Sequence, residues 1–215
     1  DGASRLAPNT QDLYDFEVYL RKNSEPPVPG VHFTKMITDR AIDFVRQPED
    51  KPFFLWLAHR APHPSTLADA GPNGDWDSAP PGAPRYRIED MPHVLHSAKA
   101  GDDLSDKPPQ QRSSPSRFVH NVLANKAGGM REHIRRAHEQ VDYMDQQVGE
   151  LMNALDDAGK LDNTIFVFVS DNGGFFGERG MAVKGPFLYD EMVRVPLLIS
   201  WPARVPQGET RDALI

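Results

Sequence analysis

The feature that most constrains the fold is a long run of apolar side chains at helical spacing in the second half of the chain. They recur at alternating intervals of four and three residues: Met130, Ile134, Ala137, Val141, Met144, Val148, Leu151, Leu155 and Ala158. This spacing predicts a helix with one apolar face, and Gly159 is placed to end it in a left-handed conformation. The charged residues between these positions are expected to form its solvated face: Arg135, Arg136, Glu139 and Asp142.

Three short apolar runs predict buried strands. They occupy residues 53–58, 165–169 and 195–202, and the second follows the long helix across a tight connection. A further helix is predicted over residues 33–45, with its apolar face formed by Phe33, Met36, Ile37, Ala41, Phe44 and Val45. Helices and strands thus alternate, which predicts an α/β fold with a mainly parallel (mixed) sheet flanked by helices.

Composition narrows the functional classes. The chain has 215 residues, 39% of them hydrophobic, which is enough for one large domain or two small ones. A net charge of −7 without long runs of one sign argues against a nucleic-acid partner. The absence of cysteine excludes a disulfide, a thiolate nucleophile and a cysteine zinc site within these residues. No apolar run reaches transmembrane length, so no membrane partner is expected.

Two features concern the extent and regularity of the chain. It begins Asp1-Gly2-Ala3, which is neither an initiator methionine nor a signal peptide, so we expect a piece of a longer protein. Its 20 prolines are concentrated between Pro62 and Pro115. We therefore expect a long irregular region over residues 67–125, of the kind that is usually functional or disordered.

Polar residues follow the predicted strand at residues 165–169. Ser170, Asp171 and Asn172 come directly after it and precede two glycines. The carboxyl end of such a strand faces the crevice where open α/β sheets bind ligands. A carboxylate and a carboxamide there offer the oxygen ligands that calcium or magnesium requires. The same residues are also typical of a simple turn, and from this segment alone both interpretations stay open.

A second polar site follows the predicted strand at residues 53–58. His63 lies between two prolines, so it is unsuited to a helix or a central strand and is expected on a rigid loop. A histidine there could contact a ligand, or it could be an ordinary surface residue.

Four segments in order resemble the sulfatase family of the alkaline-phosphatase-like superfamily. They are KPFFLWLAHRAPHPS from Lys51, VDYMDQQVGELMNAL from Val141, LDNTIFVFVSDNGG from Leu161 and KGPFLYDEMVRVPLLISWPA from Lys184. A shorter segment, DDLSDKP from Asp102, resembles the glucosamine-6-sulfatase-like branch. The resemblance implies an alkaline-phosphatase-like fold, of which residues 1–215 would be the central part of a single catalytic domain.

The resemblance also implies roles for four residues. Asp171 and Asn172 would bind calcium, in preference to magnesium, while His63 and Lys184 would contact the sulfate ester. These roles are physically coherent, because hydrolysis shifts negative charge onto the leaving oxygen and nearby positive groups stabilise it. Arg179 departs from the family pattern, in which a histidine often follows Gly-Glu, so a role for histidine there is in doubt.

The family's nucleophile is a formylglycine made from the cysteine or serine of a C/SxPSR motif. It is expected upstream of this chain, as are the paired aspartates that complete the calcium site. Residues 113–117 match SxPSR, but Ser113 follows His63 and lies in a polar region where such a match arises easily by chance. We therefore expect a sulfuric ester hydrolase whose remaining domain is a necessary partner, and no turnover by residues 1–215 alone.

Two alternatives stay open at this stage. The chain could belong to a phosphatase or phosphonate monoester hydrolase of the same superfamily, although Asp171 followed by asparagine favours sulfate with calcium. It could also be a non-catalytic homologue that binds a sulfated glycan. The substrate is expected to be a sulfated small molecule or glycan, and a cysteine-free sulfatase of this kind fits a bacterial periplasmic or secreted enzyme.

Overall fold

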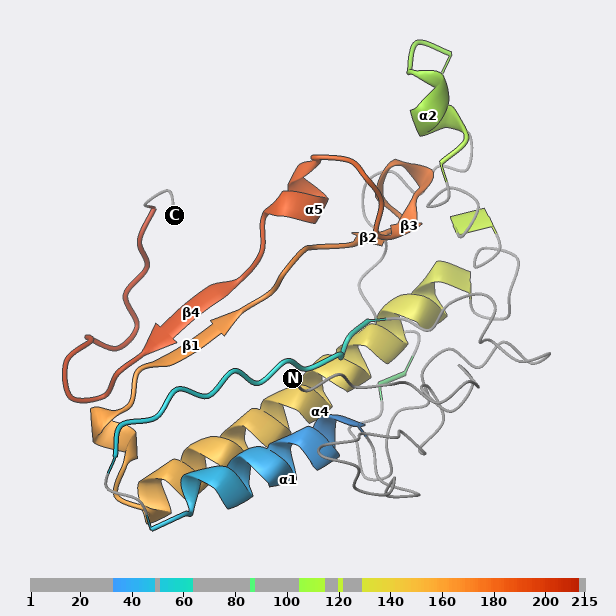
Figure 1. Ribbon diagram of the computed structural model, residues 1–215. Helices are drawn as coiled ribbons and strands as arrows, with labels where there is room; N and C mark the ends of the chain where they lie inside the picture. The colour runs from blue at the N-terminus through green and yellow to red at the C-terminus, as the bar shows by residue number, and fades with distance from the viewer. Residues whose placement is uncertain are drawn as a thin grey trace.

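The computed structural model describes residues 33–48, 51–63, 86–87, 105–114, 120–121 and 129–212. Its helices and strands are α1 (Phe33–Val45), α2 (Pro109–Arg112), α4 (Gly129–Asp157), β1 (Phe166–Val169), β2 (Phe175–Phe176), β3 (Ala182–Val183), α5 (Asp190–Val193) and β4 (Leu197–Ser200). Two 3-10 turns, η3 (Leu161–Asn163) and η4 (Glu178–Gly180), connect them. Figure 1 shows α1 and α4 side by side, with β1 and β4 running along the same direction as the helices.

The main core lies where α1 packs against α4. Its buried members are Ala41, Val45, Leu151, Ala154 and Leu155. Half-buried side chains from α1 itself and from three further segments complete it: Ile42, Leu55, Leu57, Leu161 and Phe166. Because β1 contributes Phe166 to this cluster, the helix pair forms the base on which the strand is placed.

The two long helices lie where they were predicted, with nearly the predicted bounds. Some positions that were predicted to be buried are exposed. On α1, Met36, Ile37, Ala41 and Val45 are buried as expected, whereas Phe44 is largely exposed. On α4, Val141 is also exposed. In the described part of the chain, no helix is both long and apolar enough to span a membrane.

The prediction that Glu139 belongs to a solvated face is wrong. Its side chain is 0% exposed and is paired with Arg135 one helical turn earlier. The backbone N–H of Tyr86 also donates to its carboxylate, at 3.1 Å. A neighbouring ion pair and a backbone donor from a distant segment thus compensate for the loss of water around this charge.

The carboxyl ends of α1 and α4 are joined. Gly159, with φ of 65°, ends α4 as predicted, and the backbone N–H of Lys160 donates to the carbonyl of Leu155 at 2.8 Å. The ammonium group of Lys160 then donates to the carbonyls of Val45 and Gln47, at 2.7 and 2.9 Å. Those carbonyls belong to the end of α1, where helical partners are lacking.

Both strand pairs formed by the described residues are antiparallel. β1 pairs with β4, with Phe166 opposite Ser200, and β2 pairs with β3, with Phe175 opposite Val183. The parallel pairing expected from the alternation of helices and strands is therefore not among them. β1 is also half-covered, not buried on both faces, because Val167 and Val169 are about half exposed.

The segment 51–63 corrects a further prediction. Residues 53–58 were expected to form a buried strand, but no strand is assigned there. Leu55 and Leu57 pack against the main core, while Phe54 and Trp56 are 84% and 77% exposed. The segment is thus extended with one apolar face inward, but no described neighbour forms a backbone ladder with it.

The predicted irregular region at residues 67–125 lies largely outside the described residues. Within it, the described residues include one short helix, α2, so the region is not wholly irregular. Ser113 caps this helix, since its hydroxyl group donates to the carbonyl of Pro109 at 2.9 Å.

Candidate functional site

The loop after β1 carries the two predicted metal ligands and is held by its own polar groups. Ser170 donates through its hydroxyl group to the carbonyl of Asn172, at 2.8 Å. The Asn172 side chain donates through Nδ2 to the carbonyl of Gly173, at 2.7 Å. The N–H of Gly173 in turn donates to the carbonyl of Met192 in α5, at 2.8 Å. The loop is therefore both internally ordered and attached to α5.

These hydrogen bonds leave side-chain oxygen atoms of Asp171 and Asn172 available as metal ligands. Asp171 is exposed, and Asn172 uses its amide nitrogen, which leaves Oδ1 as an acceptor. A carboxylate and an amide oxygen side by side fit the hard-cation chemistry of calcium. Two side chains do not complete such a shell, and the described residues contain no group of three or more Asp, Glu or His side chains that could hold a metal ion.

The short β2–β3 hairpin brings Lys184 to the same loop. Because Phe175 lies opposite Val183, the next residues along the two strands are Gly174 and Lys184. An atom placed at the Cβ position of Gly174 would lie 3.7 Å from the carbonyl oxygen of Val183, which confirms how closely the strands approach. Val183 has φ of 58°, a conformation that β-branched residues rarely adopt. The structure thus brings Lys184 beside the loop that carries Asp171 and Asn172.

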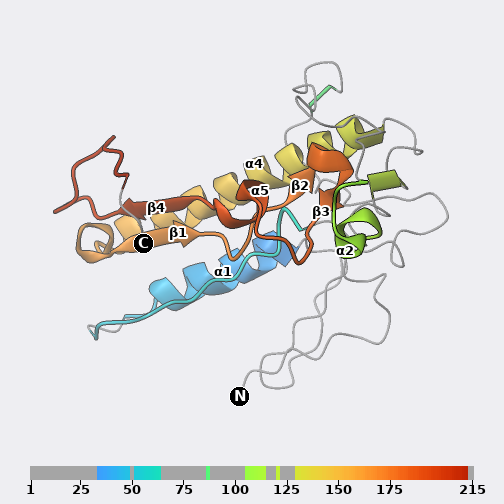
Figure 2. The same cartoon turned by 90° about the horizontal axis from the view of Figure 1, so that it is seen from above.

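His63 lies at the end of the extended segment 51–63. Its backbone N–H donates to the carbonyl of Arg60 at 2.8 Å, which closes a turn, and the Ala61–Pro62 peptide is cis. Figures 1 and 2 show that this segment runs in the same direction as β1, toward the end of the molecule where β2 and β3 lie. His63 and the loop after β1 therefore lie at the ends of two segments that run the same way, although residues 53–58 form no strand.

Arg179 has a structural explanation. Its guanidinium group lies 4.2 Å from the centre of the Tyr189 ring and 3.4 Å from a carboxylate oxygen of Glu191. The other carboxylate oxygen of Glu191 is buried and has no hydrogen-bond partner in the described residues. Arg179 therefore links the η4 turn to α5, and sequence reasoning, which noted only a departure from the family pattern, missed this role.

Two further histidines are removed from solvent, His59 half-buried and His133 buried. Both ring nitrogens of His59 are buried without a hydrogen-bond partner in the described residues, and burial lowers the pKa of this imidazole. His133 on α4 packs against Phe176, with ring centres 5.4 Å apart. Burial, and to a smaller extent the charge of Arg136, lowers the pKa of His133 to about 4. Both rings are therefore neutral at neutral pH.

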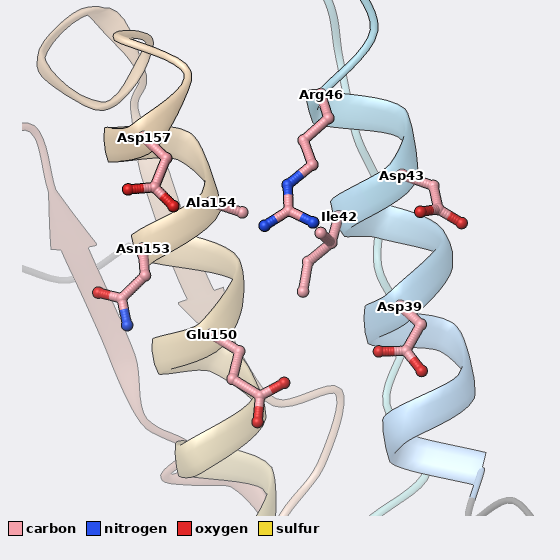
Figure 3. Close-up of a pocket in the computed structure, with 8 residues that line it drawn as sticks. All are labelled: Asp39, Ile42, Asp43, Arg46, Glu150, Asn153, Ala154 and Asp157. Carbon is pink, nitrogen blue, oxygen red and sulfur yellow. The ribbon is translucent and has the colours of Figure 1, made fainter.

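A pocket between α1 and α4 is separate from these residues. Figure 3 shows it lined by carboxylates from both helices, with Arg46 and Ile42 pointing toward α4. None of the four sequence-predicted site residues lines it. Ser113 does not line this pocket either. It is an exposed residue at the end of α2.

Comparison with known proteins supports the resemblance. A family model described as Sulfatase matches residues 6–215. The N-acetylglucosamine-6-O-sulfatase of Bacteroides thetaiotaomicron is 44% identical, over 94% of this chain and 44% of the relative. An arylsulfatase of Clostridium perfringens is 31% identical, over 84% of this chain and 34% of the relative. The chain therefore spans less than half the length of these curated relatives.

The fold agrees with solved structures. A crystal structure from Bacteroides thetaiotaomicron that is assigned to the sulfatases aligns with 87% of this chain and 40% of its own, with a TM-score of 0.61 and 22% identity. This similarity confirms the alkaline-phosphatase-like fold that the sequence predicted. The family match over residues 6–215 shows that the chain belongs to the sulfatase family.

Proposed function

We propose that this chain forms part of a sulfuric ester hydrolase that cleaves a sulfate monoester at the loop after β1. The observation that carries the proposal is the pairing of β2 with β3, which places Lys184 beside the loop of Asp171 and Asn172. A cation next to two oxygen donors is the arrangement that a site for both a divalent metal ion and an anionic ester requires.

In this proposal Asp171 and Asn172 hold a calcium ion through their side-chain oxygens. A bound calcium ion would supply positive charge beside the sulfate oxygens. Lys184 contributes an ammonium group from the strand end beside this loop, and it can donate hydrogen bonds to an oxygen of the ester. His63, on its turn at the end of segment 51–63, would contact the ester from the neighbouring segment.

The proposal assigns the nucleophile to residues outside this chain. A formylglycine hydrate would supply the attacking oxygen, and Ser113 is unsuited to that role because its hydroxyl group donates to the end of α2. The described residues also provide only two of the six to eight oxygen ligands typical of calcium. Residues 1–215 alone should therefore show no turnover, while the full-length protein should be active.

The substrate that we propose is a sulfated sugar, with a 6-O-sulfate on N-acetylglucosamine as the first compound to test. This choice rests on the name of the relative that is 44% identical, N-acetylglucosamine-6-O-sulfatase. An aryl sulfate is the second compound, because another relative is an arylsulfatase.

The test compares sulfate-ester and phosphate-ester hydrolysis by the full-length protein, before and after a chelator removes divalent ions. We expect sulfate hydrolysis that is lost on chelation and restored by calcium. Lys184→Ala and Asp171→Ala should each lower kcat/KM by about a hundredfold or more, as loss of an electrostatic contact in a catalytic site does.

Lys51→Ala is the matched control for Lys184→Ala, since Lys51 is also exposed but begins segment 51–63, at the opposite end from His63. Its kcat/KM should equal that of the unsubstituted protein. Faster hydrolysis of the phosphate ester would assign the chain to a phosphatase instead. Tight binding of the sulfated sugar without turnover would identify a non-catalytic binding protein.

A further inference from the structure

We infer that Gly173 is a positioning residue, which fixes the loop of Asp171 and Asn172 to the same packed unit that carries Lys184. This inference rests on the proposed function, because it assigns a purpose to the loop in that reaction. It concerns a contact between the main-chain atoms of two segments, which residue types alone did not reveal.

Gly173 meets the backbone of α5 with no room for a side chain. A Cβ atom built on Gly173 would lie 2.0 Å from the carbonyl oxygen of Glu191, 3.0 Å from its carbonyl carbon and 3.2 Å from the Cα of Met192. All three are main-chain atoms, so no rotation of a side chain could relieve the overlap. Glycine is therefore required here for close approach.

A hydrogen bond accompanies this contact. The N–H of Gly173 donates to the carbonyl of Met192 at 2.8 Å, within the same two residues of α5 that a Cβ atom would strike. The carbonyl of Gly173 accepts from the side chain of Asn172, so one residue connects a metal-ligand side chain to α5. A shift of Gly173 would move Asn172 with it.

The other side of the contact is a small core of its own. Phe175, Met181 and Met192 are buried together, and Phe187 and Tyr189 pack against them. Met181 precedes Lys184 in the chain and Phe187 follows it, so the segment that bears Lys184 is anchored at both ends. Because Met192 belongs to this core and also accepts the bond from Gly173, the loop and Lys184 share one support.

The adjacent glycine provides a natural comparison. A Cβ atom on Gly174 would meet only the carbonyl oxygen of Val183, at 3.7 Å, which is ordinary van der Waals contact. Gly174→Ala should therefore be tolerated, whereas Gly173→Ala must separate the loop from α5. The two changes add the same methyl group to neighbouring residues of the same loop.

The experiment compares these two variants in the full-length protein. We expect Gly173→Ala to raise the calcium dissociation constant, measured by calorimetry, about tenfold, and to lower kcat about a hundredfold, as misplacement by about 1 Å does. Gly174→Ala should stay within about twofold of the unsubstituted protein in both quantities. Equal effects of the two variants would overturn the inference.

Hydrogen exchange provides a readout that does not depend on activity. In the unsubstituted protein, the amide of Gly173 should exchange as slowly as the amides of the β2–β3 hairpin. It should exchange faster in Gly173→Ala, while the main core of α1 and α4 stays protected. Fast exchange at Gly173 in the unsubstituted protein would overturn the inference, even if Gly173→Ala does not fold.

The same data separate this inference from the proposed function. An unsubstituted protein that neither hydrolyses a sulfate ester nor binds calcium would refute the proposed function. The loop would still be shown to be fixed to α5 if the amide of residue 173 exchanges slowly in the unsubstituted protein and in Gly174→Ala, but faster in Gly173→Ala. Normal catalysis with an unprotected loop would refute the positioning role alone.

Discussion

The ammonium group of Lys160 donates to the backbone carbonyl of Val45 at 2.7 Å, across a sequence separation of 115 residues. Lys160 is the third residue after the end of α4, and Val45 is the last residue of α1. The side chain of Lys160, just beyond α4, therefore supplies a hydrogen-bond donor to a carbonyl at the end of α1 that lacks a helical partner. This contact holds together the two helices on which β1 rests.

Replacing Lys160 with methionine should destabilise the protein by about 1 to 2 kcal/mol, because two carbonyls at the end of α1 lose a charged donor. Chemical unfolding monitored by circular dichroism would measure the change. Lys51→Met is the control, and it should leave the unfolding midpoint unchanged. An equal midpoint for both variants would show that the contact contributes nothing to stability.

Removing the partner of a buried charge should be more harmful than removing both charges. Arg135→Met removes the ion-pair partner of the buried Glu139 carboxylate, and should cost about 3 kcal/mol of stability. The double variant that also replaces Glu139 with methionine should be more stable than Arg135→Met alone. Arg136→Met is the control, because it removes an ion pair with the partly exposed Glu132 and leaves the pair of Arg135 with Glu139 in place. A double variant less stable than Arg135→Met would contradict this account.

Stability should fall as the pH drops from about 6.5 to about 4. Burial holds the pKa of His133 at about 4 in the folded protein, whereas a solvated histidine in the unfolded chain has its ordinary pKa of about 6.5. The unfolded state thus binds more protons in this window, and the loss can reach about 3 kcal/mol. His133→Gln should flatten the pH dependence of the unfolding midpoint, and an unchanged slope would exclude His133 as its cause.

Glu132 acts in a different pH window. Hydrogen bonds from Arg135, and then from Arg136, lower the pKa of Glu132 to about 2. Its stabilising contribution is therefore present above pH 4.5 and is lost only as the pH falls toward 2. The midpoint of thermal unfolding at pH 5.5 should therefore not respond to protonation of Glu132. Below pH 4.5, Glu132→Gln should change how the unfolding midpoint depends on pH.

Ser113→Ala should leave sulfate hydrolysis by the full-length protein unchanged. The hydroxyl group of Ser113 donates to the carbonyl of Pro109 at an exposed helix end, so it is engaged with the main chain and not with a base among the described residues. A steady-state comparison of kcat/KM tests this expectation. Loss of activity in this variant would make the SxPSR match at residues 113–117 functional after all.

Local patterns predicted those parts of the fold that depend on neighbours in sequence. Apolar spacing gave α1 and α4, and Gly159 marked the end of α4, because both depend on helical geometry alone. The burial of Glu139 could not be predicted in this way, since it depends on Tyr86, 53 residues away. The segment 53–58 was mistaken for a strand because its apolar side chains did not reveal whether a neighbour would pair with it.

The candidate site shows the same division. Residue types and the family resemblance identified Asp171, Asn172, His63 and Lys184, since carboxylate, amide, imidazole and ammonium groups have characteristic chemistry. The β2–β3 register that brings Lys184 to the loop was not predicted, because strands of two residues carry almost no periodic signal. The contact of Gly173 with α5 could not be predicted from side-chain chemistry, because it involves main-chain atoms.

The hydrogen bond from Gly173 to Met192 also bears on how the protein ages. When the backbone nitrogen of a glycine attacks the side-chain carbonyl carbon of the preceding asparagine, ammonia leaves and a cyclic imide forms, which water then opens to a carboxylate. In the folded protein that nitrogen is directed at the carbonyl of Met192, and the side chain of Asn172 is itself bound to the loop. Folding should therefore protect Asn172 from slow deamidation, which would be seen as mass heterogeneity of the loop peptide after storage in urea but not in native buffer.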